Sequence, residues 1–200
     1  MTAAAAGSPL VAEAALLAEL AGLVPAFWGS LEAAGLRYLR LQDLTAELVR
    51  PCVADVKLGR RTADERLGDA ARAAKCASKD AATTSAALGI RLAGMQHWAP
   101  SGEAWAVVRA ERRWCAELTP ASLRAALRVF STCGGALDTD THVLRGADGL
   151  LAQLRALGDW FSRQTLLHFF GASALLLFDA APVMQEGGCG LRPCVKVRRG

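Results

Sequence analysis

The amino-acid sequence predicts an α+β fold with a small first lobe, residues 1–43, and a larger second lobe, residues 44–200. The chain has 200 residues, of which 52% are hydrophobic and 21% charged, enough to bury a core. A few short segments alternate like strands, and several separate segments have the apolar spacing of helices. The two lobes are expected to meet near Asp43, where a ligand cleft is expected.

The first lobe is predicted to contain one helix and one strand. Residues 11–23 carry apolar side chains at helical spacing, and Pro25 ends that helix. Residues 36–41 read Leu-Arg-Tyr-Leu-Arg-Leu, an alternation typical of a strand. Residues 43–45 then form a short connection to the second lobe.

The second lobe is predicted to begin with a strand over residues 51–58 that stops at Gly59. An alanine-rich helical stretch over residues 64–88 follows, and then a strand over residues 90–98. Thr119 and Pro120 indicate the start of the next helix, because these residue types favour the N-cap and the first turn. The remaining predicted elements are that helix to residue 130, a loop at 133–141, a helix at 149–161, a buried strand with its approach at 166–178, a glycine-rich turn at 187–190 and a short strand at 195–197.

Composition excludes several classes of protein. A net charge of +4 and a pI near 8.9 are too mild for a dedicated nucleic-acid binder, and no nucleic-acid partner is expected. The longest apolar run, residues 166–178, is too short to span a bilayer, so no membrane span is expected. Residues 1–23 lack Lys and Arg and do not resemble a secretory signal, so a nuclear or cytoplasmic location is expected.

Cysteine and histidine are not spaced like metal ligands. The six cysteines form no C-x-x-C pair, which favours reduced thiols over a zinc site or a disulfide framework. The three histidines are isolated from one another, and His168, within the apolar run, is expected to be a core imidazole. No residue is assigned to a metal.

The predicted strand over residues 51–58 carries a candidate catalytic pair. Alternation places Asp55 and Lys57 on one face, about 6.6 Å apart along the strand, and the apolar residues on the other. A carboxylate and an ammonium side by side suit phosphoryl transfer, where the acid orients a hydroxyl and the lysine neutralises phosphate charge. Alternation alone is also satisfied by an ordinary ion pair on a half-exposed strand.

A basic stripe is predicted on the following helix. Arg72, Lys75 and Lys79 are spaced i, i+3 and i+7, so they fall within about 60° of one another around the helix axis. Such a stripe could bind a compact ligand that carries several phosphates. The alternative is a solvated helix face.

These residues resemble the inositol polyphosphate kinase family. Pro51, Asp55, Lys57 and Gly59 match its P-x-x-x-D-x-K-x-G signature. Five further segments match other family motifs: Leu41-Gln42-Asp43-Leu44-Thr45, Lys79-Asp80 with Thr83-Thr84, Gly89-Ile90-Arg91-Leu92-Ala93-Gly94, Trp160-Phe161 with Gln164-Thr165-Leu166, and Ser173 to Asp179. The resemblance runs from about residue 23 to residue 196, and the spacing around Lys79 is most similar to plant-type multikinases.

The resemblance implies a two-lobed kinase fold, an incomplete first lobe and an inserted substrate-binding helical segment at 64–88. It implies an enzyme that transfers the γ-phosphate of ATP, with Mg²⁺, to a hydroxyl of inositol trisphosphate or tetrakisphosphate. The implied nucleotide contacts are Gln42, Asp43, Leu44 and Asp55; the implied catalytic residues are Asp55 and Lys57; and the implied substrate contacts are Lys57, Arg72, Lys75 and Lys79. Whether Asp55 holds the ribose or acts as a general base is left open.

The sequence departs from the family pattern at both ends. Nothing before residue 11 matches the family's glycine-bearing turn and phosphate-binding lysine. Near the C-terminus, Arg198 stands where the family has a metal-binding aspartate. A chain with impaired catalysis is therefore expected, and the alternative function is a non-catalytic module that binds inositol phosphates or an acidic partner. The sequence gives no indication of the oligomeric state.

Overall fold

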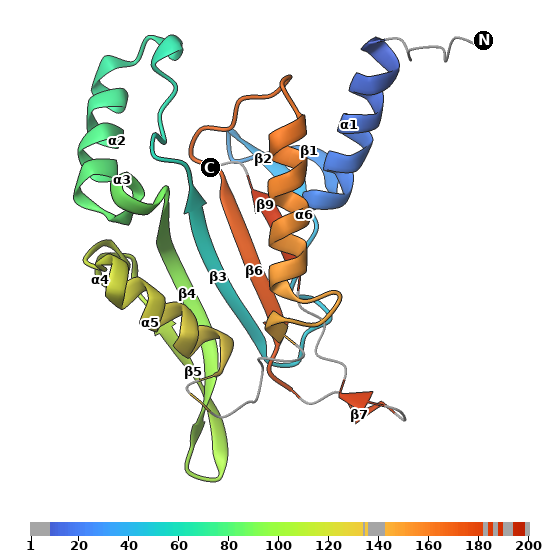
Figure 1. Ribbon diagram of the computed structural model, residues 1–200, viewed down its shortest axis with the longest axis vertical. Coiled ribbons are helices and arrows are strands. Elements are labelled where there is room, and N and C mark those ends of the chain that lie inside the picture. Colours follow the sequence, from blue (N-terminus) through green and yellow to red (C-terminus); the bar gives the residue numbers. More distant parts are fainter. Residues whose placement is uncertain are drawn as a thin grey trace, which may run out of the picture.

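A five-stranded antiparallel sheet in the order β5-β4-β3-β6-β9 forms the centre of the protein (Figure 1). The computed structural model describes residues 9–133, 135, 143–181, 184–185, 188–189 and 194–198. The strands are β3 (Pro51–Leu58), β4 (Ile90–Ser101), β5 (Ala104–Ala110), β6 (Ser173–Asp179) and β9 (Cys194–Arg198). The sheet and its separate helices confirm the predicted α+β class.

Helices cover one face of this sheet and form the core with it. The helices are α4 (Arg112–Ala116), α5 (Pro120–Ser131) and α6 (Leu150–Arg163). Thr119 caps α5 as predicted, because its hydroxyl accepts the Ser122 N–H, and the Ser122 hydroxyl accepts the Thr119 N–H in return. Phe130 of α5 packs edge to face on Phe178 of β6, with 5.2 Å between ring centroids.

Strand β3 lies at the middle of the sheet, and its alternation was predicted correctly. Cys52, Ala54 and Val56 are buried in the core, and their register partners on β6 are Phe178, Leu176 and Ala174. The opposite face of β3 therefore carries Asp55 and Lys57. The sequence assigned both faces because a strand buried on one side must alternate.

The first lobe holds α1 (Pro9–Leu23) and a hairpin of β1 (Phe27–Ala33) and β2 (Leu36–Leu41). Helix α1 and strand β2 were predicted, whereas β1 was not, because Gly29 and a bulge after Phe27 interrupt its alternation. Helix α1 rests on α6: the indole N–H of Trp160 donates to the Leu16 carbonyl, and Arg163 pairs with Glu19 at 2.6 Å.

The single helical stretch predicted over residues 64–88 is wrong, because the chain divides there into three helices. They are η1 (Glu65–Leu67), α2 (Ala70–Ala82) and α3 (Thr84–Leu88). Gly68 takes a positive φ of 73°, which ends η1, and the Asp69 carboxylate caps α2 by accepting the Arg72 N–H. Thr83 is extended, with φ −121° and ψ 179°, and separates α2 from α3. The high alanine content of residues 64–88 favours one continuous helix, so these breaks were not predicted.

Other boundaries also differ from the prediction. Strand β4 continues to Ser101 and turns into β5, and neither β5 nor α4 was predicted. The buried strand expected with its approach over 166–178 is β6, which begins at Ser173 and follows an irregular approach in which Gly171 has a φ of 67°. Most of the loop predicted at 133–141 lies outside the described residues. Of the turn at 187–190, the structure describes only β8 (Gly188–Cys189), which pairs with β7 (Met184–Gln185).

The cysteines whose side chains are described, Cys52, Cys76, Cys115 and Cys133, are free thiols, in agreement with the prediction for that part of the chain. Cys52 and Cys133 touch in the core, with 3.6 Å between their sulfur atoms. Across the described residues, no helix combines the length and apolarity that a bilayer crossing requires. The division of the chain at residue 43 stays a prediction.

Candidate functional site

Asp55 and Lys57 lie on the face of β3 that points away from the core. The register places Asp55 opposite Leu175, and Lys57 opposite Ser173, on the neighbouring strand β6. The Lys57 ammonium donates a hydrogen bond of 3.0 Å to the Gly171 carbonyl, which fixes the direction of this long side chain. The predicted catalytic pair is therefore brought together on one rigid strand.

Gly59, just beyond β3, supplies a sharp turn. Its φ of 97° favours glycine, and its N–H donates to the Gly89 carbonyl at 2.8 Å. Gly89 also has a positive φ, 71°, where it ends α3. The two glycines of the motifs thus join the end of β3 to the start of β4.

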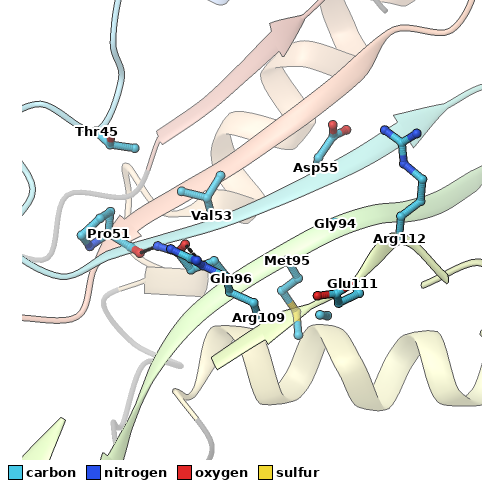
Figure 2. Close-up of a pocket in the computed structure, with 11 residues that line it drawn as sticks. Thr45, Pro51, Val53, Asp55, Gly94, Met95, Gln96, Arg109, Glu111 and Arg112 are labelled. Carbon is cyan, nitrogen blue, oxygen red and sulfur yellow. Dashed lines mark hydrogen bonds between the residues drawn. The ribbon is translucent and has the colours of Figure 1, made fainter. Parts of the chain in front are cut away.

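A groove of about 620 Å³ runs along the sheet face beside Asp55. Figure 2 shows Asp55 and Arg112 near Gly94, with Pro51, Gln96 and Arg109 further along the strands. The lining residues come from the connection after β2, from β3 and β4, from the end of β5 and from the start of α4: Thr45, Pro51, Val53, Asp55, Gly94, Met95, Gln96, Arg109, Ala110, Glu111 and Arg112. The segment at residues 42–45 is the hinge that the family resemblance implies between the two predicted lobes. A ligand in this groove would reach from this hinge, at Thr45, to the carboxylate of Asp55.

The predicted hinge is held by hydrogen bonds of its own. The Gln42 main-chain N–H donates to the Ala26 carbonyl at 2.8 Å, and the Gln42 side chain accepts from the Ala26 N–H. Asp43 accepts 2.8 Å hydrogen bonds from the N–H and the hydroxyl of Thr45. These bonds, that from the main-chain N–H above all, hold the pKa of Asp43 below its ordinary value. Of residues 42–45, only Thr45 lines the groove.

Asp179 anchors the segment that connects the hinge to the sheet. Its carboxylate accepts hydrogen bonds from three main-chain N–H groups, those of Val49, Arg50 and Ala181, at 2.8, 2.8 and 2.9 Å. This motif residue is 5% exposed and lies at the end of β6, so its contacts are structural. Asp179 thereby holds the start of β3 in place beside the groove.

The basic stripe lies on the exposed side of α2. Arg72, Lys75 and Lys79 all belong to this one regular helix and all are exposed, so they share a face as predicted. The structure does not gather them in one cavity. Arg72 lines a separate hollow of about 490 Å³, whereas Lys75 and Lys79 do not line it.

Three residues near the candidate site were placed wrongly or not singled out from the sequence: His168 in this hollow, and Arg109 and Arg112 in the groove. His168, expected in the core, is exposed and lines the hollow with Arg72, because it lies in the irregular segment before β6 and not in a strand. Asp64 and Asp69 also line it, so its charge is mixed. Arg109 and Arg112, in the groove beside Asp55, were not singled out because β5 and α4 were not predicted.

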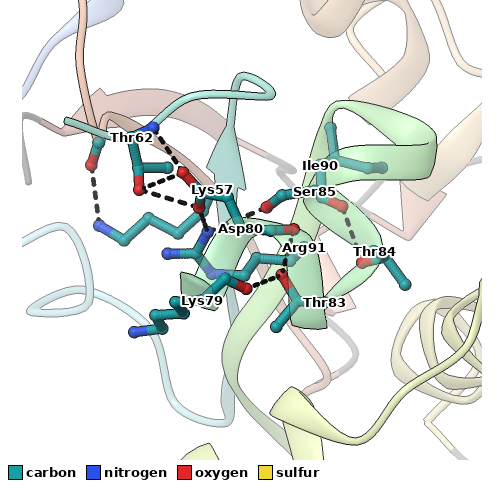
Figure 3. A network of polar contacts seen from close by, with 10 residues as sticks. Lys57, Thr62, Lys79, Asp80, Thr83, Thr84, Ser85, Ile90 and Arg91 are labelled. Atoms are coloured by element: carbon teal, nitrogen blue, oxygen red, sulfur yellow. Dashed lines mark hydrogen bonds and ion pairs between the residues drawn. The ribbon is translucent and has the colours of Figure 1, made fainter. Parts of the chain in front are cut away.

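A buried ion pair lies beneath the basic stripe (Figure 3). Asp80 of α2 and Arg91 of β4 are 2.7 Å apart, and both side chains are 7% exposed. Asp80 also accepts hydrogen bonds from the N–H and hydroxyl of Thr62, and Arg91 donates to the Ser85 hydroxyl. The motif residues Asp80 and Arg91 are thus engaged with each other.

The described residues contain no cluster of three or more side chains of the kinds that hold metal ions (His, Cys, Asp or Glu). Mg²⁺ prefers oxygen ligands, usually one or two carboxylates with waters. In the sheet register, Ser173 stands between Lys57 and Arg198, so the aligned positions on both sides carry basic residues. No step is therefore assigned to a metal.

Comparison with known proteins agrees with this geometry. The family model described as inositol polyphosphate kinase matches residues 38–197, a range that holds the sheet, the groove and the basic stripe. The chain therefore belongs to the inositol polyphosphate kinase family.

Several relatives are inositol polyphosphate multikinases. The rice protein (Oryza sativa subsp. indica) is 42% identical over 147 residues, which cover 72% of this chain and 49% of the relative. The beta multikinase of Arabidopsis thaliana is 32% identical over 162 residues, covering 76% of this chain and 53% of the relative. The chain thus spans about half the length of these curated relatives.

Two solved structures share the fold. An inositol phosphate multikinase solved in a protein-engineering study has a TM-score of 0.72 and 27% identity, covering 90% of this chain and 78% of that chain. The multikinase of S. cerevisiae, solved with ADP and Mn²⁺, has a TM-score of 0.63 and 16% identity, covering 96% and 84%.

Proposed function

We propose that this protein takes part in ATP-dependent phosphorylation of inositol polyphosphates, with inositol trisphosphate or tetrakisphosphate as the acceptor. The observation that carries the proposal is the placement of Asp55 and Lys57 side by side on β3, beside a groove that begins at the hinge. Membership of the inositol polyphosphate kinase family gives the class of reaction.

In this proposal, the nucleotide lies in the groove beside Asp55. The main chain at residues 42–44 is proposed to contact the adenine; the Gln42 N–H already donates to the Ala26 carbonyl, so the Gln42 carbonyl and the main chain of Asp43 and Leu44 would make these contacts. Asp55 holds the ribose or takes the proton of the acceptor hydroxyl. Lys57 places its ammonium where the transferred phosphoryl group carries charge, and the Gly171 carbonyl keeps it there.

The exposed cations of α2 are proposed to bind the phosphates of the inositol ring. Arg72, Lys75 and Lys79 present three charges on one helix face, and a ligand with three or four phosphates can contact all of them at once. Mg²⁺ on the ATP phosphates would neutralise charge during transfer, and none of the described residues is assigned as its ligand.

A kinase assay tests the proposal. Purified protein is incubated with γ-labelled ATP, Mg²⁺ and inositol trisphosphate, and the products are separated by anion exchange. Slow transfer of label to the inositol ring is expected, because Arg198 stands where the family has a metal-binding aspartate, and Asp55→Asn should reduce it further by roughly 10²-fold or more. Loss of transfer with retained binding of inositol trisphosphate would favour the alternative function, a non-catalytic binding module. Binding of neither ligand would refute both.

The nuclear or cytoplasmic location also stays a proposal. Microscopy of the protein with a fluorescent tag at its C-terminus would test it.

A further inference from the structure

Helix α2 is attached to the rest of the protein in an unusual way. Asp80 is the only buried residue of its thirteen, although helices of this length normally dock through an apolar stripe. The side chains of the proposed phosphate-binding face, Arg72, Lys75 and Lys79, are all exposed. The position of that basic face therefore depends on a charged contact and not on a packed core.

The partner of Asp80 is placed directly beside the proposed catalytic lysine. Arg91 is the register partner of Lys57 in the β3–β4 ladder, so the two residues are neighbours across the sheet. From this position the Arg91 guanidinium reaches Asp80 at 2.7 Å and the Ser85 hydroxyl at 2.9 Å (Figure 3). One side chain thus ties α2 and α3 to the strand next to β3.

Thr62, in the segment after β3, closes the arrangement from the other side. Its N–H and its hydroxyl donate to the Asp80 carboxylate at 2.8 and 2.9 Å. Asp80 is therefore bonded through Thr62 to the segment that follows β3, and through Arg91 to strand β4. At the same end of the helix, the Lys79 carbonyl accepts the Thr83 hydroxyl, which fixes the last turn that carries Lys79.

We propose that Asp80 is a positioning residue: its buried ion pair with Arg91 holds the basic face of α2 in a fixed position relative to Lys57. This inference rests on the proposed function for the identity of the ligand. Removing the carboxylate charge would leave Arg91 as a buried, uncompensated cation, which is strongly unfavourable. The α2 segment would then move to let that cation reach water, and the phosphate contacts would move with it.

The test compares Asp80→Asn with a control variant, Glu103→Gln. Glu103 is an exposed residue in the β4–β5 turn, and each substitution removes one negative charge. Calorimetry measures the affinity of each variant for inositol trisphosphate and for ATP, well below the unfolding temperature. Asp80→Asn should weaken inositol trisphosphate binding about tenfold or more while ATP binding stays within about twofold. Glu103→Gln should change neither.

A second variant covers the case in which Asp80→Asn does not fold. Thr62→Val removes one donor to the carboxylate and leaves the ion pair intact, so it should give a smaller effect in the same direction. Unchanged inositol trisphosphate affinity in the folded Asp80→Asn protein, or in Thr62→Val when Asp80→Asn does not fold, would overturn the positioning role.

Amide hydrogen exchange without ligand separates this inference from the proposed function. Exchange over residues 70–82 should accelerate in Asp80→Asn, or in Thr62→Val, and not in Glu103→Gln. If the wild type binds no inositol phosphate, the proposed function fails, and the attachment of α2 is still decided by exchange. If exchange in α2 is unchanged, the inference fails whatever the ligand.

Discussion

Asp55 of β3 and Gly94 of β4 are register partners, so the glycine leaves the space beside the carboxylate open. A Cβ at position 94 would meet no atom within 4 Å. The backbone there does not require glycine, because Gly94 is absent from the described residues with positive φ. What glycine provides at this position is therefore open space in the groove beside Asp55.

A large side chain at position 94 should fill the groove without unfolding the protein. Gly94→Leu is expected to weaken ATP binding about tenfold or more, since the new side chain occupies the space beside Asp55. Gly94→Ala, the matched control, should change it far less. Titration with a fluorescent ATP analogue measures both, alongside thermal melts. Normal nucleotide affinity in Gly94→Leu would place the nucleotide elsewhere.

Substitutions in β3 and α2 should affect different ligands. Asp55→Asn is expected to weaken ATP binding and leave inositol trisphosphate affinity nearly unchanged, because Asp55 lines the groove. Lys79→Ala should weaken inositol trisphosphate binding roughly tenfold or more through one lost charged contact, with no effect on ATP. Arg124→Ala, an exposed cation on α5, controls for the change in charge. If neither Asp55→Asn nor Lys79→Ala altered either affinity, both assignments would be wrong.

The turn at the hinge should depend on the ionised form of Asp43. Hydrogen bonds from Thr45 hold the pKa of Asp43 below its ordinary value, so the ionised carboxylate stabilises the folded turn. That contribution is complete above the unfolded pKa of about 3.9 and is lost as the pH falls through the lower folded pKa. An NMR titration of the Asp43 carboxyl should therefore have a midpoint below the ordinary one.

The same titration in Thr45→Val identifies the donors. The midpoint should rise part of the way toward the ordinary value, because the hydroxyl is lost while the main-chain N–H remains. An unchanged midpoint would mean that the hydroxyl contributes nothing to the turn.

The turn of the β1–β2 hairpin holds an alanine in an unfavourable backbone conformation, which a substitution can relieve. Ala34 and Gly35 form this two-residue turn, and Ala34 has a φ of 51°, which is unfavourable for alanine. Ala34→Asn should raise the free energy of unfolding by up to about 1 kcal/mol, because asparagine tolerates this region better. Urea denaturation measures the change, and Ala33→Asn, in the neighbouring strand position, should give no such gain. A loss of stability in Ala34→Asn would contradict the assigned turn.

The sequence was sufficient for the parts of the site that lie on one regular element. The alternation of residues 51–58 correctly separated Asp55 and Lys57 from Cys52, Ala54 and Val56, since the strand is buried on one side only. The spacing of Arg72, Lys75 and Lys79 likewise correctly predicted a shared helix face. Both patterns depend on local geometry alone.

Contacts between elements could not be predicted in this way. Asp80 looks like any polar residue of a helix, and its burial depends on Arg91 of β4 and Thr62 of the preceding segment. His168 was expected in the core because its neighbours are apolar, but the segment is irregular and places it at the surface. The burial of Asp80 and the exposure of His168 depend on which segments pack together, and the pattern of residues within one segment does not predict that packing.

The antiparallel pairing of β3 with β6 has a consequence for folding. Cys52 opposite Phe178 and Lys57 opposite Ser173 belong to a single uninterrupted register. A slip of one residue along β6 would turn Asp55 and Lys57 inward against apolar side chains and push Cys52, Ala54 and Val56 into water. The misaligned chain would have to desolvate two charges, a heavy penalty. Asp55 and Lys57 therefore disfavour a misaligned pairing of β3 with β6, whether or not a ligand is bound.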